Sequence, residues 1–237
     1  KANHEAAAAA ALALAWEATD EERFRTAAEE KIVDVLARQQ DEGWFPEVGG
    51  MDLGYCSVLL DYVMIYVLVT DDTSPVPAMQ RLLAFMMPHI QPDYTISPEA
   101  GLCLNPYVSR LGIGLLSAEG DKNAAALVTM LNNSSPGRKG LTPYLADDLR
   151  LCRWSYLPII TSLEKNRFKE LEPSAGALIS RYPIGWTIRR DSAVAAYHEN
   201  QFHVYFSIAG GGVVRVYTDN ELACEDIGID VVSPKEI

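Results

Sequence analysis

The chain has 237 residues, 49% of them hydrophobic, so it can bury a sizeable apolar core. Its 20 basic and 32 acidic residues give a formal net charge of −12 at pH 7. This charge repels nucleic acid and anionic membranes at long range. Composition therefore excludes a disordered chain and disfavours a nucleic-acid partner.

The four cysteines are spread along the chain, with neither a CxxC pair nor a histidine close in sequence; they are Cys56, Cys103, Cys152 and Cys224. This spacing does not fit a zinc site. We expect buried free thiols, and we predict neither a metal ion nor a cofactor.

The N-terminal stretch AAAAAALALAW, residues 6–16, has the length of a signal-peptide core. Acidic residues follow it in place of a small-residue cleavage pattern, which favours a helix of the folded protein and a cytoplasmic location. No apolar run reaches the roughly 20 residues that cross a bilayer, so no membrane span is predicted. The chain begins without Met, which favours a piece of a longer protein and leaves targeting and oligomeric state open.

A helical pattern continues from the start to about Glu164, because Ala, Leu and Glu favour helices and apolar residues recur three and four positions apart. Short loops separate the expected helices, which predicts stacked helical hairpins. The expected helices are His4–Thr19, a second one from an N-cap at Asp20 to about Gln40, Tyr55–Thr70, Pro77–Met87, Tyr107–Ser117, Asp121–Asn132 and Pro143–Leu163.

After Pro173 the pattern becomes that of strands, with short β-branched and aromatic segments separated by turns. Helices followed by strands predict an α+β protein with two modules. We place the helical domain at 1–168, a connection at 169–183 and an antiparallel sheet, part of a sandwich, at 184–237. The expected strands are Gly185–Arg190, Ala193–His198, Phe202–Ile208 and Val213–Thr218.

Three short motifs carry a family resemblance. They are the pair Asn3-His4, the loop GWFPE that leads into Gly54-Tyr55, and the late segments GWTIRR and FHVYFSIAGGGVVRVY. Together they resemble the heparinase II/III-like group, polysaccharide lyases and relatives that join an α/α toroid to a β-sandwich. The resemblance implies α/α-toroid-like helical hairpins followed by a β-sandwich segment, and it implies this fold more directly than an activity.

The resemblance also assigns roles to single residues. β-Elimination from a uronic-acid polymer requires a neutralised carboxylate, removal of the proton beside it and protonation of the departing oxygen. Asn3 and Tyr55 are 52 positions apart, which is similar to the spacing in related lyases. By resemblance, Asn3 and His4 would neutralise the carboxylate, Tyr55 would carry the proton and His203 would contribute from the sheet. The residues alone also fit a helix cap at Asn3, a solvated His4, a packed Tyr55 and a solvent-facing His203.

Aromatic and acidic residues gather in the loop before the third helix. The rings of Trp44 and Phe45 can stack on a sugar, and Glu47 and Asp52 can accept hydrogen bonds from its hydroxyl groups. Tyr62, on the stripe of Tyr55, would extend this subsite. Alternatively, Trp44 and Phe45 fill the space between two hairpins. The two carboxylates count against a strongly sulfated sugar.

The sequence therefore predicts a lyase-like protein that cleaves or binds a uronic-acid-containing polysaccharide. Motifs of serine hydrolases, zinc proteases and P-loop proteins are absent. One alternative is a non-catalytic carbohydrate-binding or assembly protein on the same fold. Another is a uronyl epimerase or a glycoside hydrolase, with Asp52 and Asp61 as acid and base.

Overall fold

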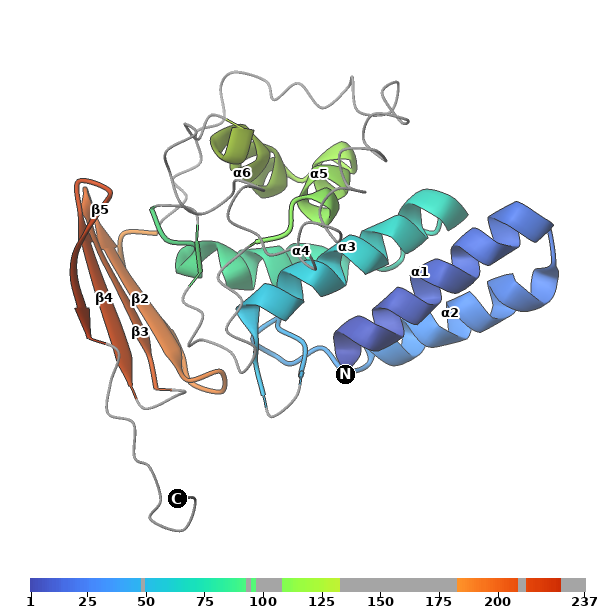
Figure 1. Ribbon diagram of the computed structural model, residues 1–237, viewed down its shortest axis with the longest axis horizontal. Helices are drawn as coiled ribbons and strands as arrows, with labels where there is room; N and C mark the ends of the chain where they lie inside the picture. Colours follow the sequence, from blue (N-terminus) through green and yellow to red (C-terminus); the bar gives the residue numbers. More distant parts are fainter. Residues whose placement is uncertain (48–49, 93–94, 97–107, 133–182, 209–211, 227–237) are drawn as a thin grey trace, which may run out of the picture.

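The structure, a computed structural model, describes residues 1–47, 50–92, 95–96, 108–132, 183–208 and 212–226. Within these residues, six α-helices and one 3₁₀ helix precede an antiparallel sheet of five strands (Figure 1). The predicted α+β class is confirmed. The toroid and the sandwich stay predictions, since the described residues form one helical layer with one sheet beside it.

The first two helices, α1 (Ala2–Thr19) and α2 (Glu22–Leu36), form a hairpin. Alanines on α1 that are fully buried let its neighbours approach closely. Asp20 has a φ of 57° and its N–H donates to the Trp16 carbonyl at 2.7 Å, so it ends α1 in the left-handed conformation. The prediction of Asp20 as N-cap of the second helix is therefore wrong, and Glu21 takes that position.

Helix α3 (Leu53–Thr70) is the core of the helical layer and packs against α1 and α5 (Leu111–Ala118). It is the one helix among the described residues that is long and apolar enough to cross a membrane, and 67% of it is buried inside the structure. Packing against other helices explains its composition.

A close contact joins α3 to α5. A Cβ atom added to Gly112 would lie 2.5 Å from the carbonyl carbon of Leu60, so only glycine fits there. The buried Asp61 carboxylate accepts from the Gly112 N–H at 2.7 Å and from the Ser109 hydroxyl. This arrangement fixes the position of α3 within the layer.

The remaining helices are α4 (Val76–Met86), η1 (Met87–His89) and α6 (Lys122–Asn132). Pro88 ends α4 close to where the sequence predicted, although the chain continues as a single 3₁₀ turn. The predicted helix at 143–163 and the connection at 169–182 lie outside the described residues.

The sheet is a meander in which each strand pairs with the next along the chain. Four of its strands were predicted. The fifth was missed because its sequence, ELACED, is acidic, exposed throughout and without apolar alternation. The strands are β1 (Gly185–Arg189), β2 (Val194–Glu199), β3 (Phe202–Ser207), β4 (Val213–Thr218) and β5 (Glu221–Asp226).

One face of the sheet packs against the helical layer (Figure 1). Val194 joins the helical core, and the Tyr205 hydroxyl donates to the Ile90 carbonyl at 3.2 Å. The Tyr217 hydroxyl donates to Gln91 Oε1 at 2.8 Å. These contacts attach the sheet to the segment around η1 and leave its opposite face in solvent.

Candidate functional site

Two helices begin at the same end of the helical layer. Figure 1 shows α1 and α3 side by side and running in the same direction. Asn3 lies in the first turn of α1 and Tyr55 in the first turn of α3. The fold thus brings to one end two residues that are 52 positions apart in sequence.

A carboxylate binds to the start of each helix. Glu47 Oε1 accepts from the Asn3 backbone N–H at 2.7 Å, and Asp52 Oδ1 accepts from the Tyr55 backbone N–H at 2.9 Å. Asp52 is the N-cap of α3, and Glu47 serves a similar role for α1 from a distant loop. Asn3 is not the N-cap of α1, which is Lys1.

Burial shapes the electrostatics of this end. Removal from water raises the pKa of Glu47, the Asn3 N–H opposes that shift, and the nearby Asp52 adds to it. Asn3 Oδ1 and Glu47 Oε2 are buried without a hydrogen-bond partner. They are acceptors still available to a ligand that carries hydrogen-bond donors. Asn3 is only 4% exposed, so a ligand reaches its side chain only if the residues that cover it move.

The thiol of Cys56 lies close to the same carboxylates. Burial raises the pKa of this thiol to about 12, with smaller contributions from Asp52 and Glu47. It is therefore an unreactive core residue, as the sequence predicted. Cys224 is free but exposed, which contradicts the same prediction for that residue.

The predicted aromatic platform is not at the surface. Trp44 is 7% exposed and Phe45 is fully buried, and both belong to the helical core. Their burial contradicts stacking on a sugar and fits the alternative, in which they fill the space between hairpins. Tyr62 is half-buried and packs against the same core.

His4 and Tyr55 keep some exposure. His4 is exposed, but neighbouring positions on a helix do not face each other, so it points away from the buried Asn3. Tyr55 is half-buried at the start of α3. Of the predicted site residues, the structure brings together Asn3, Glu47, Asp52 and Tyr55.

His203 takes part in a buried cluster at the sheet–helix interface. Its Nδ1 lies 3.0 Å from His198 Nδ1, and His198 Nε2 lies 2.9 Å from the Pro88 carbonyl oxygen. A carbonyl oxygen only accepts, so His198 Nε2–H donates to Pro88, and the two Nδ1 atoms share one hydrogen bond. A solvent-facing His203 is wrong, because alternation shows which residues share a face but not which face meets the helices.

A third histidine lies beside this pair and was missed from the sequence. Burial, with the positive charges of Arg189 and His198 nearby, lowers the pKa of His89 to about 3. Its ring packs near Phe85, with centroids 5.8 Å apart. Nothing in the sequence of η1 marks His89, since Arg189 and His198 reach it from the sheet. Of the three histidines, His198 joins the sheet to η1 through Pro88, and the cluster lies away from the site at α1 and α3.

Asp61 was weighed as half of a hydrolase pair. It is buried in the contact between α3 and α5, which raises the pKa of its carboxyl to about 7. Asp52 is committed to capping α3. Both carboxylates are thus engaged in contacts within the helical layer, and the hydrolase alternative stays a prediction. Among the described residues, no group of three or more His, Cys, Asp or Glu side chains is arranged to hold a metal ion.

Comparison with protein-family models, with curated proteins and with solved structures finds no match to this chain. The family resemblance therefore stays a prediction. Function is argued below from the residues and their geometry.

Proposed function

We propose that the protein is lyase-like and takes a uronic-acid-containing polysaccharide at the end of the helical layer where α1 and α3 begin. The observation that carries this proposal is that Asn3 and Tyr55 lie in the first turns of two neighbouring helices, each bonded through its backbone N–H to a carboxylate. Helix N-termini favour bound anions through their free N–H groups and their dipoles. The carboxylate of a uronate is the same chemical group as those of Glu47 and Asp52.

An arriving uronate would displace the Glu47 carboxylate from the Asn3 backbone N–H. Burial and the neighbouring Asp52 already raise its pKa, so it takes up a proton more readily than an exposed glutamate. The protonated side chain no longer repels the substrate carboxylate and offers it a hydrogen bond. The amide of Asn3, next to Glu47, then helps to hold the enolate that develops.

Tyr55 supplies the proton chemistry in this scheme. Its phenolate removes the proton from the carbon beside the uronate carboxylate. The electron pair of the broken C–H bond then forms the new carbon–carbon double bond. The bond to the glycosidic oxygen breaks, and the Tyr55 hydroxyl returns the proton to this departing oxygen. Atoms and charge balance without a metal ion or redox partner.

The test is a panel of uronate polymers assayed for an ultraviolet-absorbing unsaturated product. Tyr55→Phe should lower the rate by about 100-fold or more, since it removes the proton carrier and keeps the ring. Tyr66→Phe is the matched control, because it deletes a hydroxyl from another tyrosine of α3, at the far end of the helix where it donates to Asp72, and should keep the rate. Equal rates in Tyr55→Phe and the unaltered protein would reject Tyr55 as proton carrier.

Non-catalytic polysaccharide binding is the second candidate function. The burial of Asn3 favours binding over catalysis, because elimination needs this amide in contact with the substrate carboxylate, whereas binding does not. Binding of uronate polymers measured by calorimetry, with no unsaturated product at any pH between about 5 and 10, would select this candidate.

A further inference from the structure

The face of the sheet that points away from the helices carries a strip of aromatic rings on β1, β2 and β3. Trp186 lies opposite Tyr197, with ring centroids 5.2 Å apart, and Phe202 follows at 6.2 Å from Tyr197. Trp186 is 61% exposed and Phe202 is 41% exposed. These three residues, named here the aromatic strip, present their rings to solvent in a continuous row.

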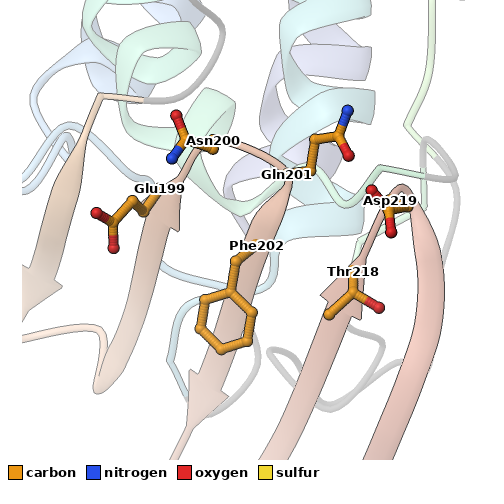
Figure 2. Close-up of a pocket in the computed structure, with 6 residues that line it drawn as sticks. All are labelled: Glu199, Asn200, Gln201, Phe202, Thr218 and Asp219. Carbon is orange, nitrogen blue, oxygen red and sulfur yellow. The ribbon is translucent and has the colours of Figure 1, made fainter.

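A depression of about 310 Å³ adjoins the strip at the ends of the strands. Figure 2 shows the ring of Phe202 beside Thr218 on the neighbouring strand, with the turn residues above them. Phe202 belongs to both features. This turn pocket is lined by Glu199, Asn200, Gln201, Phe202, Thr218 and Asp219.

The turn pocket has a stable backbone. Asp219 and Asn220 have φ angles of 53° and 65°, as a two-residue type I′ turn requires, and Asn200 in the other turn has 53°. The Asp219 N–H donates to the Gln201 carbonyl at 3.1 Å and ties the two turns together. The polar side chains thus project from a preformed frame, which lowers the entropy cost of binding.

Side-chain chemistry limits what can occupy this surface. Any ligand packed over the turn pocket must replace the water at its amide and carboxylate groups with hydrogen bonds of its own. A polyhydroxylated ligand supplies those bonds with its own hydroxyl groups, while its C–H faces cover the aromatic rings. Glu199 and Asp219 repel an anionic ligand at neutral pH.

We propose that the aromatic strip and the turn pocket form a binding surface for a neutral oligosaccharide. The Tyr197 hydroxyl donates to Glu199 Oε2 at 2.5 Å, which links the strip to the pocket and orients the carboxylate. The surface shares no residue with the site at the starts of α1 and α3. It therefore stands independently of the proposed lyase-like function and takes a differently charged sugar.

The experiment is calorimetric titration of the full chain with neutral β-1,4-linked hexasaccharides of glucose, xylose and mannose. Whichever hexasaccharide binds, Trp186→Ala should weaken its affinity by about tenfold or more. Ile188→Ala is the matched control, because Ile188 is 64% exposed on the same face of β1 and has no ring. Asp219→Asn keeps the left-handed turn and removes one charge, so neutral-sugar binding should persist.

Three results would overturn the proposal. They are the absence of binding for all three hexasaccharides, an equal loss in Trp186→Ala and Ile188→Ala, and a dimer in analytical ultracentrifugation that Trp186→Ala dissociates. The last would assign the face to a second copy of the chain. Trp186→Ala should leave any product from uronate polymers unchanged, and Tyr55→Phe should leave hexasaccharide binding unchanged, so the two proposals can fail separately.

Discussion

Replacing Gly112 with alanine tests the contact that positions α3. The added Cβ would lie 2.5 Å from Leu60 C and 2.6 Å from both Leu60 O and Asp61 N. All three are backbone atoms of α3, so no side-chain rotation relieves the overlap and α5 must move away. The movement also stretches the 2.7 Å bond from the Gly112 N–H to the Asp61 carboxylate.

The magnitude follows from two opposing effects. Overpacking of a closed contact costs about 1–3 kcal/mol and sometimes more, and rigid backbone atoms place Gly112→Ala at the upper end. Alanine in a helix recovers about 1 kcal/mol relative to glycine. We expect Gly112→Ala to lower the free energy of unfolding by about 2 kcal/mol.

Gly114 is the matched control, since it lies in the same helix and an added Cβ meets nothing within 4 Å. Gly114→Ala should raise the free energy of unfolding by about 0.5–1 kcal/mol through helix propensity alone. Urea unfolding followed by circular dichroism measures both variants at one pH. If Gly112→Ala proves as stable as Gly114→Ala, the close α3–α5 contact is not formed in solution.

Three further predictions concern pH and the sheet–helix interface. Burial raises the pKa of Asp61 to about 7, so the folded state holds a proton that the unfolded state loses near pH 4. The free energy of unfolding should therefore fall as pH rises between these two values. Asp61→Asn should remove that slope. The pKa of His89 is lowered to about 3, so stability should instead be lost as pH falls from about 6.5 towards 3. His89→Phe should flatten this part of the pH dependence of stability. An unchanged slope would mean that His89 is hydrated. Tyr217→Phe removes a buried hydrogen bond to Gln91 and should lower the free energy of unfolding by about 1 kcal/mol. The Tyr197 hydroxyl bonds to the exposed Glu199, so Tyr197→Phe should lower it by under about 0.5 kcal/mol. Equal losses of stability in urea unfolding would contradict the docking of the sheet on the helices.

Periodicity predicted much of the local structure. The helical patterns before residue 133 and four of the five strands correspond to elements of the structure, because apolar spacing reflects which side of an element is buried. β5 was missed, since an exposed edge strand buries no face and so leaves no alternation in its sequence. Asp20 was misassigned because aspartate suits both a helix N-cap and a left-handed turn.

The candidate site divides in the same way. Sequence alone indicated that Asn3, Glu47, Asp52 and Tyr55 merit attention, since residue type and spacing are local properties. Which of their atoms are committed to helix N–H groups depends on how α1 packs beside α3. The same holds for the buried histidines and the exposed aromatic strip: alternation assigns residues to two faces of a sheet, and only the docking of that sheet on the helices decides which face is buried.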